Sequence, residues 1–137
     1  MTSKDDCELL MSELLPIAEE FMKKNNEFYP FAAAMNVDGT IKHLGFYDGN
    51  ETPSSKELIL NLKNVCKHLA DNNEIKASGI VWNAGIAVEG KKEDAIVISL
   101  EHKDSYSVQV AMPYKRGFLG KYQFGNLIAI AGENDVF

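Results

Sequence analysis

The spacing of apolar residues predicts an amphipathic helix at the start of the chain. Apolar positions recur there at steps of three and four, after a polar stretch in which Ser3 or Asp5 can cap the helix, and the pattern continues to about Asn25. Pro16 lies inside the pattern, where its ring clashes with the preceding turn, so we expect a kink there. The predicted buried stripe is Cys7, Leu10, Leu14, Ile17 and Phe21.

A second helix is predicted after a polar loop. Ser54 and Glu57 form a capping-box pattern that marks its start, and the run "DNNE" after Ala70 ends it. The predicted buried stripe is Leu58, Ile59, Leu62, Val65, Cys66 and Leu69.

Between the helices, "FAAAMNVDGTIKHLGF" predicts a hairpin. Asp38-Gly39 is a typical two-residue turn, which sets the register of the two strands. The predicted pairs are Val37–Thr40, Met35–Lys42, Ala33–Leu44 and Phe31–Phe46. One face is then apolar and suited to a core. The other has little bulk and leaves room for a ligand or another element; it consists of Ala32, Ala34, Asn36, Ile41, His43 and Gly45.

After the second helix the apolar period changes to two, which indicates strands over 79–88, 95–101 and 106–112 joined by short turns. If the last turn has two residues, Tyr106 lies opposite Glu101. A short strand over 127–131 is a further possibility within an extended C-terminal tail. We therefore expect a single α+β domain over residues 1–137 in the order αββαβββ. Its antiparallel sheet should have about five strands, a hairpin plus a three-stranded meander, with two helices.

Charge and composition limit the kinds of molecule that the protein is expected to bind. The chain has 14 basic and 20 acidic residues and a net charge of −6, which disfavours nucleic acid and anionic membrane surfaces but suits solubility or a basic protein partner. The first ten residues lack the basic-then-apolar order of a signal peptide, so we expect a cytoplasmic protein. Cys7 and Cys66 fall on predicted buried helix positions without zinc-ligand spacing, so we expect two buried thiols.

No catalytic motif is present in the sequence. Phosphate-binding loops, a nucleophile elbow, zinc-protease and calcium-loop patterns are all missing, so we expect no metal or cofactor. His43, His68 and His102 are scattered along the chain, and the sequence does not show whether they converge. His43 is the strongest candidate among them, because it lies on the low-bulk face of the hairpin. Whether the protein is an enzyme stays open, with the balance toward no.

Aromatic residues at strand ends are the remaining candidate surface. "NEFYPF" contributes Phe28 and Tyr29, and "MPYKRGF" contributes Tyr114 and Arg116. Tyrosine and arginine are preferred anchors of protein interfaces, so these four residues, with His43, are the candidate binding residues. The alternative is that the aromatic rings simply close the core.

The segments "FYPFAAAMNVDGTI" and "VQVAMPYKR", with a later "FG", carry a resemblance. The chain resembles a group of small bacterial proteins in which a helix leads into a Phe-Tyr-Pro-Phe-Ala strand and a Pro-Tyr segment ends a late strand. No activity is known for this group. The resemblance implies a bacterial cytosolic single domain and no particular substrate.

Together these features favour a non-catalytic cytosolic protein-binding domain, such as a regulatory or immunity-type protein. The alternative is a small-ligand-binding protein or minor enzyme that uses the hairpin face around His43, with Ala32, Ala34 and Gly45 lining the pocket. Self-association through an exposed sheet edge is a third possibility.

Overall fold

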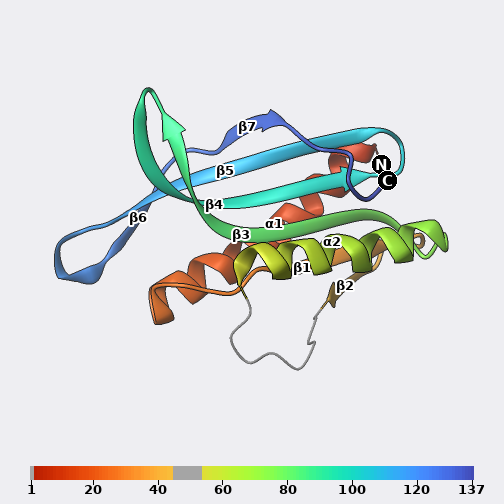
Figure 1. Ribbon diagram of the computed structural model, residues 1–137, viewed down its shortest axis with the longest axis horizontal. Helices are drawn as coiled ribbons and strands as arrows, with labels where there is room; N and C mark the ends of the chain where they lie inside the picture. The colour runs from red at the N-terminus through yellow and green to blue at the C-terminus, as the bar shows by residue number, and fades with distance from the viewer. Residues whose placement is uncertain (1, 45–53) are drawn as a thin grey trace.

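The computed structural model describes residues 2–44 and 54–137, in which a seven-stranded antiparallel sheet lies between two helices (Figure 1). The α+β class and the predicted element order are confirmed, with more strands than the five expected. The helices are α1 (Ser3–Asn25) and α2 (Ser55–Asp71), and the strands are β1 (Phe31–Asn36), β2 (Ile41–Leu44), β3 (Ile75–Val88), β4 (Lys91–His102), β5 (Tyr106–Arg116), β6 (Tyr122–Phe124) and β7 (Ile128–Ala131).

The main sheet has the order β2-β1-β3-β4-β5, and both β6 and β7 pair with β5. Between them the Gly125 N–H donates to the Pro113 carbonyl at 2.7 Å, where the partner strand of β5 is interrupted. The strand predicted over 127–131 is confirmed as β7, whereas β6 is an addition. The β5–β6 hairpin projects from one end of the molecule (Figure 1).

Helix α1 begins earlier than either predicted cap allows. The Thr2 side chain, not Ser3 or Asp5, caps it by accepting the Asp5 N–H at 3.1 Å, and the Asp5 carboxylate accepts the Thr2 N–H. The helix continues through Pro16 to Asn25. The buried face steps to Ala18 and Met22 in place of Ile17 and Phe21, so the predicted stripe was wrong at its C-terminal end. The observed buried face of α1 consists of Asp6, Cys7, Leu10, Leu14, Ala18 and Met22.

The alanines of β1 lie between both helices. Ala33 and Met35 belong to the core under α1, and Ala32 and Ala34 belong to the core under α2. All four side chains are at most 1% exposed. Small side chains on this strand let a helix approach each face of the sheet closely.

The hairpin register differs from the prediction by one residue. Ala33 pairs with His43 and Met35 with Ile41, because the loop contains three residues, with Gly39 at φ +92°. A one-residue slip moves every side chain of a strand to the opposite face. His43 therefore lies on the α1 side, away from Ala32 and Ala34. The expected pair Phe31–Phe46 and the expected lining residue Gly45 involve positions outside the described residues.

The β4–β5 turn also has three residues. His102 pairs with Tyr106 and Glu101 with Ser107, so the conditional pairing of Glu101 with Tyr106 was wrong. Ser105, the last residue of this loop, takes the left-handed conformation at φ +66°.

Gly79 on β3 sets the distance of α1 from the sheet. A Cβ at this position would lie 2.7 Å from Leu14 Cδ1 and 3.3 Å from Leu100 Cδ2.

We expect Gly79→Ala to destabilise the protein by about 1–3 kcal/mol through overpacking, as measured by urea unfolding. The matched control is Gly85→Ala on the same strand, where the new methyl group meets only the flexible end of Lys92. Equal stabilities of the two variants would contradict this account.

Candidate functional site

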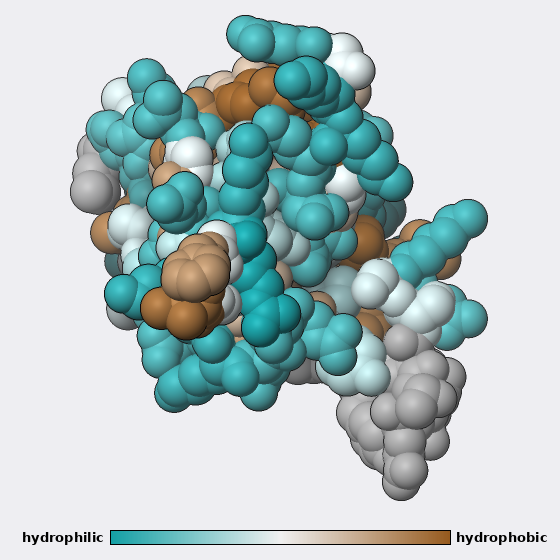
Figure 2. Space-filling view, turned by 90° about the vertical axis from the view of Figure 1, so that its left-hand side faces the viewer, coloured by the Kyte–Doolittle hydropathy of each residue, from teal (hydrophilic) through white to brown (hydrophobic). Residues whose placement is uncertain are grey.

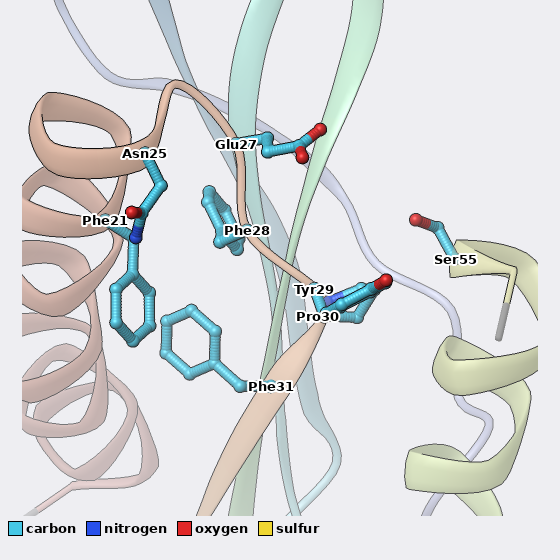
Figure 3. A pocket seen from close by; sticks show the side chains of 8 residues that line it. All are labelled: Phe21, Asn25, Glu27, Phe28, Tyr29, Pro30, Phe31 and Ser55. Carbon is cyan, nitrogen blue, oxygen red and sulfur yellow. The ribbon is translucent and has the colours of Figure 1, made fainter. Parts of the chain in front are cut away.

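A pocket of about 790 Å³ opens where the end of α1, the entry to β1 and the start of α2 meet (Figure 3). Its volume is within the range of ordinary ligand and peptide-anchor sites. Among the described residues that line it, four are aromatic and Glu27 is the only charged one. The lining residues are Phe21, Asn25, Glu27, Phe28, Tyr29, Pro30, Phe31 and Ser55.

Local sequence builds this pocket. Helix α1 ends where Asn26 adopts the left-handed conformation at φ 61° and its N–H donates to the Met22 carbonyl. The chain then leads into β1 through Tyr29 and Pro30. Proline restricts the residue before it to extended backbone, which suits the entry to a strand.

Three phenylalanines form one wall of the pocket. The ring centroids of Phe28 and Phe31 are 5.5 Å apart, and Phe21 contacts Phe31 edge to face at 5.7 Å. Figure 3 shows these rings facing one another beside α1, whereas Tyr29 points toward Ser55 at the start of α2. Phe21 and Tyr29 are 38% and 58% exposed. The pocket therefore has a packed wall and an accessible tyrosine at its mouth.

Tyr114 lies in a second aromatic group, with Tyr122 and Phe124. Its hydroxyl donates to Asn83 Oδ1 at 2.7 Å, and burial raises its pKa although the Asn83 bond opposes the rise. The Tyr122 hydroxyl likewise donates to Asn26 Oδ1 at 2.7 Å. This group closes the core under α1, as the alternative interpretation of the aromatic residues proposed.

The structure thus brings together only part of the predicted binding set. Phe28 and Tyr29 line the pocket, whereas Tyr114 packs in the core and Arg116 lies exposed on the β5–β6 hairpin. His43 is half exposed on β2, with Nε2 at 3.2 Å from Glu13 Oε1 of α1. The low-bulk face expected around His43 is not formed, because Ala32 and Ala34 pack against α2.

Sequence reasoning missed the roles of Phe21, Asn25 and Ser55 in the pocket. Phe21 had been placed in the buried stripe of α1. A signal was nevertheless present, because Leu14, Ala18 and Met22 continue the helix period at four-residue steps and leave Phe21 beside the row.

His102 belongs to a buried polar cluster that joins α1 to the sheet. The Asp104 N–H donates to His102 Nδ1 at 3.1 Å, so Nε2 carries the proton and donates to Asp6 Oδ2 at 2.9 Å. Lys76 Nζ lies 3.3 Å from the same oxygen. Burial opposes ionisation of Asp6, but the bonds to His102 and Lys76 hold its pKa below the ordinary value. The other carboxylate oxygen, Asp6 Oδ1, is buried and has no hydrogen-bond partner. None of the three residues lines the aromatic pocket.

Glu101 anchors the C-terminal tail. It is 2% exposed, and its Oε1 accepts the Val136 N–H at 3.0 Å, while Lys63 of α2 pairs with Asp135 at 2.6 Å. Burial raises the pKa of Glu101, and backbone N–H groups of Val136, Phe137 and Asp135 partly offset this effect. The tail therefore lies across a buried carboxylate and is part of the fold.

Cys7 and Cys66 are buried free thiols, as predicted, and burial raises the pKa of each to about 12. Neither is therefore an activated nucleophile at neutral pH.

Within residues 2–44 and 54–137, no three His, Cys, Asp or Glu side chains gather as a metal-ligand set. In the same residues, neither helix combines the length and apolar character needed to cross a bilayer.

No protein-family model, curated protein or solved structure matches this chain. The bacterial group that the sequence resembles therefore remains a prediction, and functional argument rests on the geometry described above.

Replacing Tyr114 with phenylalanine tests its structural role. The change leaves Asn83 Oδ1 without its donor in a partly buried position, so we expect Tyr114→Phe to lower the free energy of unfolding by about 1–2 kcal/mol. Tyr122→Phe removes an exposed bond of the same length and is the matched control, with a smaller loss. Thermal or urea unfolding measures both. If Tyr114→Phe has the same free energy of unfolding as the parent, the hydroxyl has no structural role.

The raised pKa of Glu101 predicts a pH-dependent effect of Glu101→Gln. The folded protein holds this proton at pH values where the unfolded chain has released it, so the contribution of Glu101 to stability falls as pH rises above about 4.5. The stability of Glu101→Gln relative to the parent should therefore increase between that pH and neutrality. Urea unfolding across this range measures the difference, with exposed Glu74→Gln as the control. A pH-independent or decreasing difference would contradict the assignment.

Proposed function

We propose that the protein is a non-catalytic, cytosolic protein-binding domain that holds a polypeptide segment in the aromatic pocket. The observation that carries this proposal is a pocket of about 790 Å³ with a tyrosine 58% exposed at its mouth and a packed phenylalanine wall. Aromatic side chains at a partly desolvated centre are the usual energetic anchors of protein interfaces. A regulatory or immunity-type role suits a domain of this kind.

The lining also indicates the chemistry of the partner. The rings of Phe28, Phe31 and Tyr29 suit an apolar or aromatic side chain, and Glu27 suits a neighbouring lysine or arginine. The net charge of −6 further favours a basic polypeptide over nucleic acid. We therefore expect a segment with an apolar anchor and an adjacent cation.

A small molecule is the second candidate occupant. Asn25, Glu27 and Ser55 offer polar groups beside the rings, and pockets of this volume commonly hold small ligands. The pocket, rather than the hairpin face around His43, is the place to test it.

Selection from a peptide library displayed on phage, with the purified protein as bait, tests the proposal. Selected peptides should share an apolar residue next to a lysine or arginine, and Tyr29→Ala should weaken them at least tenfold. Glu27→Gln should remove the preference for the cation. Binding is measured by calorimetry, with Leu60→Ala, 59% exposed on α2, as the matched control.

Two outcomes would count against the peptide proposal. Peptides that bind Tyr29→Ala as tightly as the parent would place the interface elsewhere. A failed selection, combined with a metabolite that stabilises the parent but not Tyr29→Ala in a thermal-shift screen, would favour the small-molecule candidate.

A further inference from the structure

The tip of the β5–β6 hairpin presents two apolar side chains to solvent. Phe118 is 90% exposed and Leu119 is 80% exposed, the highest values among the exposed large apolar side chains of the described residues. Figure 2 views the end of the molecule from which the hairpin projects, and a small apolar protrusion stands there among hydrophilic residues. Two adjacent large apolar side chains, almost fully exposed at the end of a projection, suit contact with another apolar phase.

The turn holds these side chains in place. The Gly117 N–H donates to the Lys121 carbonyl at 2.6 Å, and the Gly120 N–H donates to the Gly117 carbonyl at 3.2 Å. Leu119 has φ +64°, a left-handed conformation that is uncommon for leucine and directs its side chain as part of a fixed turn. The tip is therefore a preformed projection closed by its own hydrogen bonds.

The charge around the tip differs in sign from that of the whole chain. Residues 105–132 contain three basic residues and no acidic residue, a net charge of +3, so the other residues carry 11 basic and 20 acidic side chains, or −9. The three cations are Lys115, Arg116 and Lys121, and a single glycine on each side separates them from Phe118 and Leu119. The acidic net charge that disfavours a membrane surface thus includes a basic segment of the chain around the tip.

A cavity of about 350 Å³ lies beside the tip and is lined by Lys23 of α1 together with Gly120, Lys121 and Tyr122. Two lysines among the lining residues suit a phosphate group, although the Lys23 ammonium also lies over the Phe124 ring, 5.9 Å from its centroid. Within residues 2–44 and 54–137, Lys23, Lys115, Arg116 and Lys121 form no ion pair, whereas Lys24 pairs with Glu20 at 3.3 Å. No carboxylate of the described residues therefore competes with an external anion for these cations.

We propose that the β5–β6 tip binds an anionic phospholipid surface. Phe118 and Leu119 enter the boundary between headgroups and acyl chains, Lys23 and Lys121 hold a lipid phosphate, and Lys115 and Arg116 contact neighbouring headgroups. Apolar insertion and attraction to anionic lipid act together in such surface binding. The acidic remainder of the chain is repelled by the same surface, which orients the molecule with its tip toward the lipid.

Charge complementarity favours lipid over a folded protein partner. Two almost fully exposed apolar side chains at the end of a narrow projection fit a fluid apolar layer without a matching cavity, and the lysine-lined cavity beside them fits the phosphate of the same layer. This surface is distinct from the aromatic pocket, and the inference does not depend on the function proposed for that pocket.

Co-sedimentation with lipid vesicles tests the inference. The full chain should bind vesicles of phosphatidylcholine mixed with phosphatidylglycerol, bind phosphatidylcholine alone much more weakly, and lose binding as salt is raised. Phe118→Ser/Leu119→Ser should abolish binding. Val37→Ser/Leu60→Ser, at two exposed apolar positions elsewhere, is the matched control and should bind like the parent.

The cations are tested separately. Lys23→Gln/Lys121→Gln should weaken binding to the mixed vesicles by roughly 25-fold, since each cation near an anionic surface contributes a factor of about five. Lys91→Gln/Lys103→Gln removes the same charge from exposed positions outside the tip, so it should weaken binding clearly less. Circular dichroism verifies that all four variants are folded.

Several results would overturn the inference. Failure of the folded parent to bind mixed vesicles at low salt would do so, as would equal binding by Phe118→Ser/Leu119→Ser. If that variant instead changes the molecular mass measured by light scattering, the tip is a contact between copies of the chain. If inorganic phosphate binds at Lys23 and Lys121 while vesicles do not, the cavity serves a soluble phosphate. Capture of a folded protein through the tip without vesicle binding would identify a protein interface.

Discussion

The architecture depends on one strand, β1, being thin enough to lie between two helices. Its four central side chains are three alanines and one methionine, and they alternate between the two cores. Gly79 on the neighbouring strand gives Leu14 of α1 the same close approach on one face. Larger residues at these positions would push a helix outward and separate the elements that meet at the aromatic pocket. The small residues are thus a packing requirement of a sheet covered on both faces.

Local signals in the sequence were enough to predict the elements. Caps at Ser54 and near Thr2, helical periods and alternating strands are properties of neighbouring residues, so the α+β class and element order followed from them. The register of the first hairpin did not follow, because Asp38-Gly39 fits both a two-residue and a three-residue loop. A difference of one residue decided which face His43 occupies, and with it the location of the predicted low-bulk face.

Contacts between distant parts of the chain were beyond local patterns. Asp6 and His102 are 96 positions apart, and no spacing rule links them. The pocket was partly predictable, because Phe28 and Tyr29 are adjacent and stand at a strand entry. The contributions of Phe21 and Ser55 depend on how two helix ends meet in space, which requires the folded structure.

The last turn of α1 links the two exposed surfaces. Asn25 lines the aromatic pocket, Asn26 accepts the Tyr122 hydroxyl of β6, and Lys23 lines the cavity beside the hairpin tip. The pocket and the tip therefore share one structural support. A displacement of this turn would alter both surfaces, because consecutive residues contribute to each.

The two buried thiols can report local opening of the fold, because one lies on each helix. Cys7 belongs to the core on the α1 face and Cys66 to the core on the α2 face, and both are at most 1% exposed. A thiol reagent can reach each sulfur only when its own helix separates from the sheet. In single-cysteine variants, the rate of thiol modification therefore reports local opening on one face of the sheet at a time. Comparing the two rates can show whether the two helices separate from the sheet together or independently.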